Sequence, residues 1–370
     1  MRHHDVYCDF NILYSSVDSL LNKRHEINCL IGLHKPRIIS LTEIMPKNCF
    51  EINIDVEFKI DGYNMFINKN PQRGVIIYVI DHIEAHEFHF DNGTNESVWC
   101  TFRYNECKFL IGNVYRQHRG NKVDFIHKIR DHFTTVYQKN NFDCILITGD
   151  FNFPLITWNK PCYNYPETLF VEALRDAYFV QMVDEPTRFR SNQSSNILDL
   201  VLCNDDNWVD NIQHLPPIGK SDHELLLISL NVTTRSECVS YERFNYYKGD
   251  YARCREVLQS VKWDVMEEMD VNDAWLYFKN KIKEVEANFI PLTPKNRNRR
   301  PSWITRSVKR IINKKHKLYK KLKNNRTEKN VVEYKSIRNK TKHLIRESVR
   351  LFENKMANEC KTNVKGFGSM

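Results

Sequence analysis

The stretch ILITGDFNF, residues 145–153, places an acidic residue and an amide two positions apart, directly after an apolar run. The run is typical of a buried strand, and Gly149 lets the chain turn as it leaves the sheet. Residues two apart on an extended chain face the same side, so we expect Asp150 and Asn152 to point outward together and Phe151 to point into the core. Such a carboxylate and amide can hold a water and a phosphate oxygen between them. An ordinary turn capped by Asp and Asn is the alternative interpretation.

The bulk composition limits the class of protein. A chain of 370 residues with 41% hydrophobic residues is expected to contain one domain of roughly 200 to 250 residues plus an extension. Its 11 cysteines are spread singly without a C-x-x-C pair, which favours reduced thiols in an intracellular protein over disulfides or a zinc site. The start, MRHHDVYCDF, lacks the apolar core of a signal peptide, and no apolar run approaches about 18 residues. We therefore expect neither secretion nor a membrane span.

Charge is distributed unevenly along the chain. Residues 291–370 carry 24 Lys and Arg against five Glu, whereas residues 1–290 carry 31 basic against 41 acidic residues. The protein is thus an acidic body followed by a basic segment. Such a segment suits binding to phosphate backbones. A solvated helical face, or docking of the basic helices onto the acidic body, would explain the same charges.

Short strand-like runs recur through the first 230 residues, bounded by Gly, Asn, Asp or Pro. Helical patterns lie between some of them, which predicts an α/β sandwich of two packed sheets with helices outside. A doubly wound sheet fits less well, because the strands between residues 64 and 115 follow one another without helices. The expected strands are VYCDFNIL, RIISLTEI, YNMFIN, GVIIYVI, VWCTFRY, FLIGNVY, CILITGD, LDLVLC and ELLLISL.

The clearest helical pattern of this region runs from Val17 to Ile31, with apolar residues on one face and Asp18 available near its start. Two more helices are expected at about 122–137 and 167–175. After about residue 243 the pattern becomes all-helical, and two apolar stripes among Lys and Arg predict two amphipathic helices. The stripes are Val308, Ile311, Ile312, Tyr319 and Leu322, followed by Ile337, Leu344, Ile345, Val349, Phe352 and Met356.

These changes divide the chain into an α/β domain at 1–235, a helical linker at 236–290 and a basic helical tail at 291–370. The tail begins with PLTPKNRNRRP, which reads as a Pro-rich basic linker. Its Lys-rich stretch is the candidate nucleic-acid-binding element, and its Lys/Arg clusters permit a nuclear location. The lysines expected to bind are Lys314, Lys315, Lys317, Lys320 and Lys321.

Further acidic residues lie at the ends of other predicted strands. Glu43 ends the strand in LTEI, and Asp222 and His223 precede another in GKSDHELLLISL. Glu43 and Asp222 would suffice for Mg²⁺, which takes one or two protein carboxylates together with water and phosphate. Asp222 and His223 can both face one site only if their segment is irregular. A lone His is usually structural, but Asp199, a carboxylate inside the apolar strand LDLVL, needs a donor such as the His223 imidazole.

Five motifs in chain order, LTEI, IGNVY, ITGDFN, LDLVL and GKSDH, resemble those of the endonuclease/exonuclease/phosphatase superfamily, which has the DNase I-like fold. More narrowly, SLLNKRHEI, KPRIISLTEIMPKN, QRGVIIYV, EPTRFR and HLPPIGKSDH resemble the endonuclease domain of non-LTR retrotransposons. FNYYKGDY, the PSW at 301–303 and KRIINKKHKLYKKL resemble the segment that joins this domain to a reverse transcriptase. The resemblance covers nearly the whole chain. Since no paired Asp-Asp of a polymerase follows residue 243, we expect no copying activity.

The resemblance implies how metal and water would be handled. Glu43 becomes a ligand of Mg²⁺, or of Mn²⁺ as an alternative, with Asp222 in the same cluster. Asp150 becomes the general base that activates water, and Asn152 orients the water or the scissile phosphate. No other cofactor is implied.

The resemblance also implies how the phosphate would be held. Tyr115, at the end of IGNVY, would contact the phosphate, although it could equally be an aromatic residue that closes the sheet edge. His223, oriented by Asp199, would stabilise the charge that builds up on the pentacovalent phosphate. The implied product is a nick in DNA with a 3′-hydroxyl, and the implied partners are DNA and the RNA of the element.

One position departs from the family pattern. The family usually has an Asn near the end of the first strand, and counting back from LLNK places Ser16 there. A serine hydroxyl is shorter than an amide and lacks its combined donor and acceptor, so we expect weakened metal or phosphate binding. Asn11 lies five residues earlier and could substitute only through a shift in register.

Three functions compete on these grounds. The leading hypothesis is a Mg²⁺-dependent DNA endonuclease. The second is a catalytically decayed remnant that binds nucleic acid through residues 291–370, which Ser16 favours. The third is another enzyme of the same fold, such as an abasic-site repair nuclease or a small-molecule phosphoesterase. The long basic segment disfavours the phosphoesterase, because a small substrate does not need it.

Overall fold

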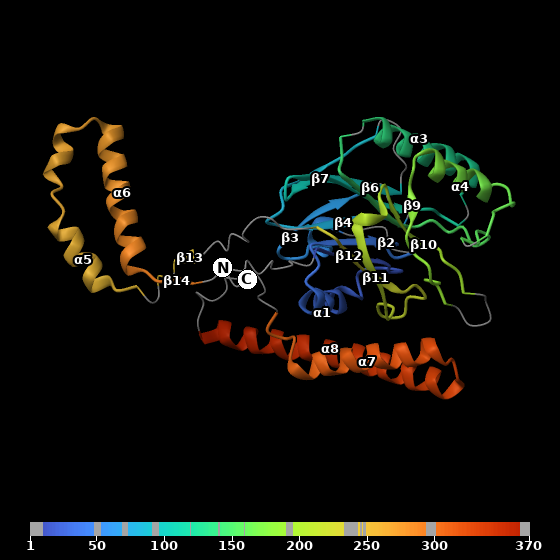
Figure 1. Cartoon of the computed structure of the whole chain (residues 1–370). Coiled ribbons are helices and arrows are strands. Elements are labelled where there is room, and N and C mark those ends of the chain that lie inside the picture. The colour runs from blue at the N-terminus through green and yellow to red at the C-terminus, as the bar shows by residue number, and fades with distance from the viewer. Residues whose placement is uncertain are drawn as a thin grey trace, which may run out of the picture. The chain divides into compact units, whose positions relative to one another are not determined.

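Two six-stranded mixed sheets form the body of the protein (Figure 1). The first sheet runs in the order β11 (Val209–Leu215), β12 (Leu225–Leu230), β1 (Phe10–Ser16), β2 (Ile38–Thr42), β4 (Val75–Ile80) and β3 (Tyr63–Ile67). The second runs in the order β5 (Ala85–Glu87), β6 (Ser97–Tyr104), β7 (Cys107–Tyr115), β8 (Cys144–Asp150), β10 (Asp199–Cys203) and β9 (Val180–Gln181). The computed structural model describes residues 10–47, 53–68, 73–90, 96–118, 120–139, 141–158, 160–189, 195–232, 243–244, 246, 249–293 and 301–362.

The two sheets pack face to face through alternate side chains of their strands. Phe10 and Ile12 of β1 share one buried core with Cys100 and Phe102 of β6. Side chains of a strand alternate between its two faces, so each sheet buries one set of residues here and the other set beneath helices. The predicted α/β sandwich is therefore confirmed.

Helices cover the outer face of each sheet. Helices α3 (Lys122–Lys139) and α4 (Glu167–Asp176) pack on the second sheet, where Phe133 and Phe170 join its apolar residues. Helix α1 (Arg24–His34) packs on the first sheet through Ile27 and Leu30, near the short helix α2 (Ile54–Glu57). The helices predicted at 122–137 and 167–175 thus occur within two residues of their expected ends.

The first predicted helix begins later than the pattern suggests. The apolar pattern starts at Val17, but α1 begins at Arg24. The reason is that Asp18 and Ser19 have φ of 42° and 76°, in the left-handed region that a right-handed helix cannot include. The N–H of Ser19 instead donates to the carbonyl of Glu43, 2.7 Å away, which ties this turn to the end of β2.

The C-terminal segment forms a hairpin of α7 (Arg306–Asn324) and α8 (Glu328–Thr362), which lies outside α1 (Figure 1). Both apolar stripes expected from the sequence contribute to its interface, and Cys29 of α1 belongs to the same buried cluster. Whereas the sequence pattern separates residues 291–370 from the body, residues 300–370 fold with residues 1–235 into one compact unit. Burial of the apolar stripes against α1 is the physical cause of this grouping.

Residues 236–299 form a second compact unit. It contains α5 (Tyr251–Ser260) and α6 (Val271–Phe289), and the two-residue strands β13 (Arg243–Phe244) and β14 (Leu292–Thr293) pair at its base. Asp270 caps α6 by accepting from the N–H groups of Asn272 and Asp273. Most of the predicted linker PLTPKNRNRRP and the Lys/Arg cluster at 296–300 lie outside the described residues.

The sequence led us to expect no membrane span and reduced thiols. Among the residues that the structure covers, no helix combines the length and apolarity needed to cross a membrane. The cysteines it describes are free thiols, namely Cys29, Cys100, Cys107, Cys144, Cys162, Cys203 and Cys254.

Candidate active site

The stretch GDFN lies where two strands of the second sheet end together. Strand β8 ends at Asp150, and β10 starts at Asp199, which is the direct antiparallel partner of Asp150. Gly149 is required by packing, because a Cβ atom there would lie 2.2 Å from the carbonyl oxygen of Val114 on β7. The absence of a side chain at Gly149 thus lets β7 and β8 pair closely up to the carboxylate of Asp150.

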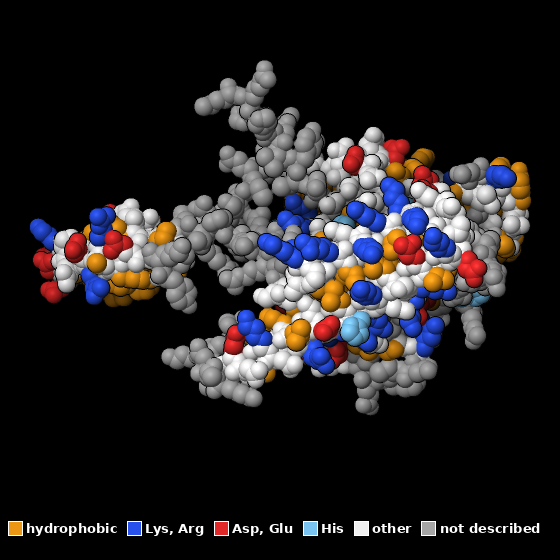
Figure 2. All heavy atoms as spheres, turned by 90° about the horizontal axis from the view of Figure 1, so that it is seen from below, with side chains coloured by type: hydrophobic (Ala, Val, Ile, Leu, Met, Phe, Trp, Pro, Cys, Tyr) orange, Lys and Arg blue, Asp and Glu red, His pale blue; other side chains and the backbone are white. Residues whose placement is uncertain are grey.

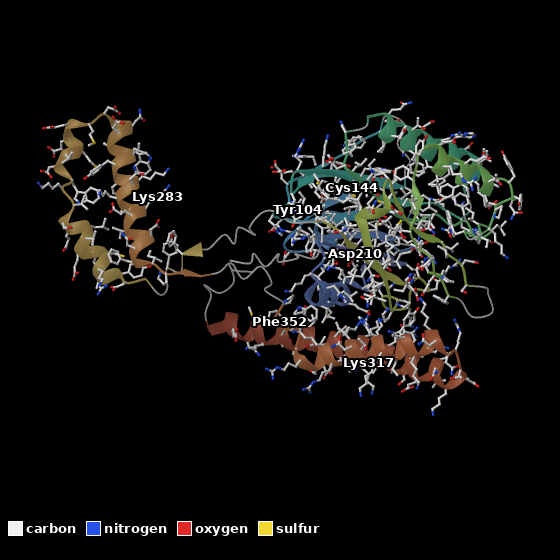
Figure 3. All side chains as sticks on the ribbon, in the orientation of Figure 1. Tyr104, Cys144, Asp210, Lys283, Lys317 and Phe352 are labelled. Atoms are coloured by element: carbon white, nitrogen blue, oxygen red, sulfur yellow. The ribbon has the colours of Figure 1, made fainter. Side chains whose placement is uncertain are left out.

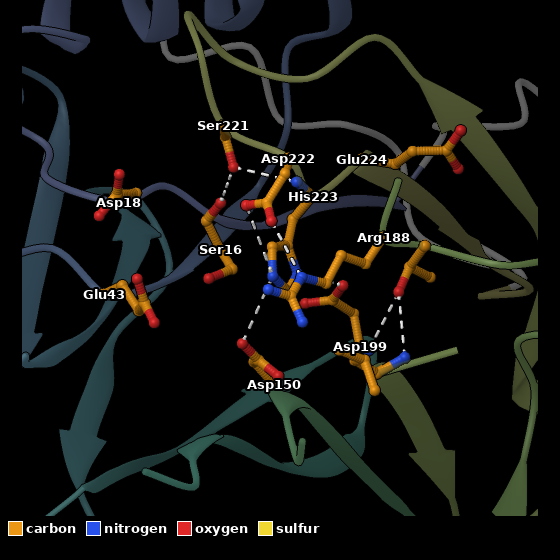
Figure 4. A network of polar contacts seen from close by, with 12 residues as sticks. Ser16, Asp18, Glu43, Asp150, Arg188, Asp199, Ser221, Asp222, His223 and Glu224 are labelled. Carbon is orange, nitrogen blue, oxygen red and sulfur yellow. Dashed lines mark hydrogen bonds and ion pairs between the residues drawn. The ribbon is translucent and has the colours of Figure 1, made fainter. Parts of the chain in front are cut away.

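His223 joins these two carboxylates (Figure 4). Its Nδ1 atom lies 2.7 Å from Oδ2 of Asp199, and its Nε2 atom lies 3.8 Å from Oδ2 of Asp150. The hydroxyl of Tyr14 donates to the other oxygen of Asp199 at 2.8 Å. Asp199 therefore has the donors that its burial requires, and His223 is held with one ring nitrogen facing Asp150.

Burial and neighbouring charges shift the protonation of this group. Burial is the largest influence on Asp150 and raises its pKa to about 8, although His223 opposes the shift. Burial alone would lower the pKa of His223, but the carboxylates of Asp199 and Asp150 raise it to about 10. His223 is thus a cation at neutral pH, and Asp150 changes to the carboxylate form that a general base requires at a pH of about 8.

Glu43 lies beside this group, directly after β2. Its Oε1 atom accepts a hydrogen bond from the hydroxyl of Tyr115 at 2.7 Å, and its Oε2 atom pairs with Arg73. Arg73 also pairs with Asp18, 2.6 Å away. Burial and the charge of Glu43 raise the pKa of Tyr115, which keeps the phenol a neutral donor. The backbone of Glu43 has φ of 54°, a strained value for a non-glycine residue, and such strain is common at functional sites.

Asp222 and His223 lie in an irregular segment, residues 216–224, between β11 and β12. The irregularity allows both side chains to meet, with Oδ1 of Asp222 4.0 Å from Nε2 of His223. The other oxygen of Asp222 accepts from Nε of Arg188 at 2.9 Å. Ser221 anchors the segment by donating to the carbonyl of Ser16 at 2.7 Å.

Asn152 lies beyond the end of β8, so strand alternation does not place its side chain. Its φ is 53°, a left-handed value that Asn tolerates better than most residues. Its amide donates to the carbonyl of Arg116 at 2.9 Å, and the guanidinium of Arg116 donates to the carbonyls of Phe151 and Asn152. Phe151 is fully buried, as the alternation predicts. The structure thus couples the side chain of Asn152 to the backbone of Arg116.

Ser16 is the last residue of β1 and is buried. It pairs with Thr42 at the end of β2, so the position that the family pattern assigns to an Asn does lie at this edge of the first sheet. Asn11 lies near the other end of β1, where its side chain accepts from Ser229 at 2.8 Å. The strand register therefore excludes Asn11 as a substitute for Ser16.

The five lysines predicted to bind nucleic acid differ in their exposure to solvent. Four of them, Lys314, Lys317, Lys320 and Lys321, are exposed on α7. Figure 2 shows Lys and Arg side chains gathered on the face that α7 and α8 form, and Figure 3 labels Lys317. Lys315 is buried and donates to the carbonyl of Pro217 at 2.8 Å, so it is not available to a nucleic acid. Helical periodicity explains the difference, since neighbouring residues on a helix point in different directions.

The donor set of the site fits a divalent metal ion. Ligand atoms of Asp150, Asp199 and His223 lie within 4.8 Å of one another and could hold one once His223 has lost its proton. The Oδ1 atom of Asp150 is buried without a hydrogen-bond partner among the described residues, which is unfavourable unless another ligand satisfies it. Oxygen ligands suit hard ions such as Mg²⁺. The sequence pattern assigns the metal to Glu43 and Asp222, each of which pairs with an arginine here.

The sequence matches a known family in the region that carries most of these residues. Residues 109–227 match the family model described as Endonuclease-reverse transcriptase. This range includes β7, β8 and β10 together with the segment 216–224. The match covers part of both sheets of the sandwich and about a third of the chain.

Three solved structures of nucleases and their domains resemble the chain. The endonuclease domain of TRAS1, a telomere-specific non-LTR retrotransposon, is 15% identical, with a TM-score of 0.49 over 61% of this chain and 100% of that chain. The AP endonuclease LMAP from Leishmania major is 14% identical, with a TM-score of 0.48 over 60% of this chain and 87% of that chain. The catalytic domain of APE2 from Xenopus laevis is 15% identical, with a TM-score of 0.48 over 61% and 94%. No curated protein sequence matches the chain.

Several residues of the sandwich that hold the candidate site were not expected from the sequence. They are Tyr14, Arg73, Arg116, Arg188 and Ser221, and all of them hold a residue of the predicted site through a side-chain interaction. Arg73 and Arg188 lie within the motifs QRGVIIYV and EPTRFR, which the resemblance singles out without assigning a role. Ser221 likewise lies within the motif GKSDH, whereas Tyr14 had no signal of its own, because its hydrogen bond to Asp199 joins strands of different sheets.

Proposed function

We propose that this protein is a metal-dependent endonuclease that hydrolyses phosphodiester bonds of DNA, as a target-nicking domain of a non-LTR retrotransposon would. The observation that carries the proposal is the chain Asp150, His223 and Asp199, with separations of 3.8 and 2.7 Å. The match of residues 109–227 to a family described as Endonuclease-reverse transcriptase supports it. Such a site provides a base, a cation and an orienting carboxylate in one place.

Asp150 acts as the general base for the attacking water. Asp150 has a pKa of about 8, and its unpartnered Oδ1 atom is free to accept a proton from a water in the site. Asn152 follows in the same turn and positions the water or the scissile phosphate, with Arg116 fixing the backbone of this turn. The roles of Asp150 and Asn152 rest on the resemblance as well as on this geometry.

His223 and Tyr115 act on the phosphate. His223 is a buried cation, so it stabilises the negative charge that grows on the phosphorus oxygens during in-line attack. Asp199 keeps the imidazole oriented for this task through its interaction with Nδ1. Tyr115 donates a hydrogen bond from a phenol that remains neutral, and a phosphate oxygen could accept it in place of Glu43.

Glu43 and Asp222 would hold a magnesium or manganese ion through their carboxylates, beside the carboxylate of Asp150. When bound, such an ion neutralises developing charge on the phosphate and lowers the pKa of a bound water. Arg73 and Arg188 lie on two of these carboxylates and would have to share or release them. Ser16 at the edge of the first sheet would weaken this site relative to an Asn.

The exposed lysines of α7 provide the phosphate contacts outside the site. Lys314, Lys317, Lys320 and Lys321 lie on the basic face of the hairpin, and several such contacts give strong but sequence-independent binding. The same chemistry suits the RNA of an element as a second partner. A substrate of nuclear DNA implies action in the nucleus, which the Lys-rich clusters permit.

Nicking of supercoiled plasmid by the full chain in Mg²⁺ or Mn²⁺ tests the proposal. The wild-type chain should nick, Asp150→Ala should lose the activity, and Asp210→Ala, an exposed carboxylate on β11, should retain it. Equal nicking by wild type and Asp150→Ala would rule out Asp150 as the base. Nicking only after Ser16→Asn would show an impaired copy. Cleavage of an abasic oligonucleotide but not of plasmid would favour a repair nuclease instead.

A second candidate function is DNA binding without hydrolysis. The observation that favours it is that arginines already neutralise Glu43 and Asp222. Paramagnetic relaxation by Mn²⁺ distinguishes the two functions independently of activity. Binding of Mn²⁺ by the wild-type chain supports the nuclease function. Binding of Mn²⁺ by Arg73→Met supports it as well, if this variant nicks DNA when the wild-type chain does not. If neither chain binds Mn²⁺ or nicks DNA while both bind DNA, the non-hydrolytic function is the better description.

A further inference from the structure

The segment 216–224 carries two residues of the proposed site, Asp222 and His223, yet it belongs to neither flanking strand. An irregular segment needs fixed partners if its side chains are to keep a precise geometry. Partners at both of its ends come from α7, namely Lys315 and Tyr319, which lie 98 and 95 residues after the residues that they contact. Both lie in the stretch KRIINKKHKLYKKL, to which the resemblance assigns no role at the site.

The first end of the segment is held by Lys315. Its side chain is 4% exposed, donates to the carbonyl of Pro217 at 2.8 Å and pairs with Glu26 of α1. The other oxygen of Glu26 accepts from the N–H of Gly219 at 2.9 Å. Lys315 and Glu26 therefore fix the backbone of the segment at two points just before Asp222.

The second end is held through Glu224, the residue after His223. Its carboxylate is fully buried and accepts from the hydroxyl of Tyr319 at 2.7 Å and from Nζ of Lys323 at 3.2 Å. His214 of β11 contacts the same carboxylate. A buried carboxylate is costly unless donors surround it, so the position of Glu224 depends on these partners.

Lys323 also reaches the segment that supports Asp199. Its Nζ atom lies 2.6 Å from Glu185, two residues before Thr187. Thr187 accepts from the N–H of Asp199 through its hydroxyl at 3.1 Å, and its carbonyl accepts from the N–H of Glu224 at 2.7 Å. The head of Lys323 thus lies between the two segments that position the pair of Asp199 and His223.

Lys315, Tyr319 and Lys323 follow one another at intervals of four residues on α7, so their side chains share one face of the helix. The face carries charged and hydroxyl groups where a helix that only needed to pack would carry apolar ones. Replacing a buried ion pair by apolar residues is often neutral or stabilising, so stability alone does not account for Lys315 with Glu26 or for Lys323 with Glu224. Their hydrogen bonds instead coincide with the two ends of the segment that carries Asp222 and His223.

We propose that α7 is a positioning element of the active site, in which Tyr319 and Lys323, acting through Glu224, hold His223 and Asp222 in their working geometry. The inference rests on the nuclease function proposed above. Since α7 lies outside the region matched by the family model, the proposal rests on the contacts observed in this chain. Lys315 supports it from the other end of the segment.

Matched pairs of tyrosine and lysine substitutions in the full chain test this role. Tyr319→Phe removes the hydroxyl on Glu224 but keeps the ring, whereas Tyr334→Phe removes a buried hydroxyl without a hydrogen-bond partner in the described structure. The two rings lie against each other, 5.1 Å apart, so both variants perturb the same core. Lys323→Met is compared with Lys283→Met, which removes an exposed lysine from α6, and Lys323→Arg should rescue by keeping the charge.

Single-turnover nicking well below the melting temperature gives the first measurement. Tyr319→Phe and Lys323→Met should lower the rate constant by about 10- to 100-fold at saturating DNA, since misplacement by about 1 Å has effects of this size. The DNA concentration for half-maximal rate should stay unchanged, and the two controls should match wild type. Unchanged rates in both test variants, or equal losses in the controls, would overturn the proposal.

Amide hydrogen exchange of residues 216–224 and the NMR signals of the His223 imidazole give a measurement independent of activity. Faster exchange and shifted His223 signals in Tyr319→Phe, but not in Tyr334→Phe, support positioning by α7. Identical exchange in both variants contradicts it. If the wild-type chain nicks no DNA, the proposed nuclease function is wrong. Hydrogen exchange and the NMR signals of His223 would then still decide whether α7 holds the segment 216–224.

Discussion

His223 and Asp199 are joined by an interaction of 2.7 Å between Nδ1 and Oδ2, inside a site where both side chains are buried. The second oxygen of Asp199 accepts from Tyr14, so the carboxylate is fixed at both ends. Asp199 in turn is the strand partner of Asp150, and this pairing places the imidazole against the proposed base. The orientation of His223 therefore follows from the register of β8 and β10.

Asp199→Asn should reduce nicking by about 100-fold or more, because His223 loses the charge that raises its pKa, and the amide has one acceptor oxygen where the carboxylate offers one each to His223 and Tyr14. The pKa of His223, measured by NMR, should fall below its wild-type value in the same variant. Tyr14→Phe provides the control, since it removes only the second hydrogen bond to Asp199 and should have a smaller effect on both quantities. A wild-type pKa of His223 in Asp199→Asn would refute this account.

Gly149→Ala should lower the free energy of unfolding by about 1 to 3 kcal/mol or more, because its Cβ would overlap the carbonyl of Val114 and push β7 and β8 apart. Nicking should fall as well, since Asp150 follows directly. Denaturant unfolding measures the first effect. Gly120→Ala is the control, because its Cβ would lie 3.6 Å from the nearest atom and should leave stability unchanged. Equal free energies of unfolding for Gly149→Ala and Gly120→Ala would contradict the prediction and show that β7 and β8 accommodate the added methyl group.

The stability of the α7–α8 hairpin should fall as the pH is lowered from about 6.5 to about 4. Burial, together with Lys315 and His34, lowers the pKa of His316 from 6.5 to about 4. In this window the unfolded chain binds a proton that the folded chain does not, so stability is complete above pH 6.5 and is lost on acidification. Thermal unfolding followed across the window should show the slope.

The matched variants for this prediction are His316→Gln and His343→Gln. His316→Gln removes the buried imidazole and should flatten the pH slope, whereas the exposed His343 of α8 should leave the slope as in wild type. Identical slopes in all three chains would assign the acid sensitivity to groups other than His316.

DNA binding should weaken steeply with salt if the hairpin binds phosphates. The double variant of Lys317 and Lys320 to Ala should reduce the slope of log affinity against log salt by about 2, which is about one for each phosphate that is no longer neutralised. A double variant of Lys279 and Lys283, which lie exposed on α6, removes the same charge from another part of the chain. Equal slopes for the two double variants would mean that the hairpin face has no special role in binding.

Much of the fold follows from local patterns in the sequence. Alternating apolar residues predicted most strands of both sheets, and helical periodicity predicted α3, α4, α7 and α8. Strand β11 was missed because VDNIQHL is largely polar and lies exposed in part at the edge of the first sheet. The start of α1 was misplaced because the positive φ angles of Asp18 and Ser19 depend on interactions with Glu43 and Arg73.

The residues of the candidate site could also be named from the sequence, but the contacts among them could not be predicted. GDFN, LTEI, LDLVL and GKSDH named Asp150, Glu43, Asp199 and His223, since each motif lies on or beside an apolar strand. Only the tertiary structure decided that arginines pair with Glu43 and Asp222, and that Lys315 and Lys323 point inward from a helix that reads as a nucleic-acid-binding surface. The physical reason is separation along the chain. Tyr319 meets Glu224 across 95 residues, and packing of α7 on the body, rather than any local periodicity, brings them together.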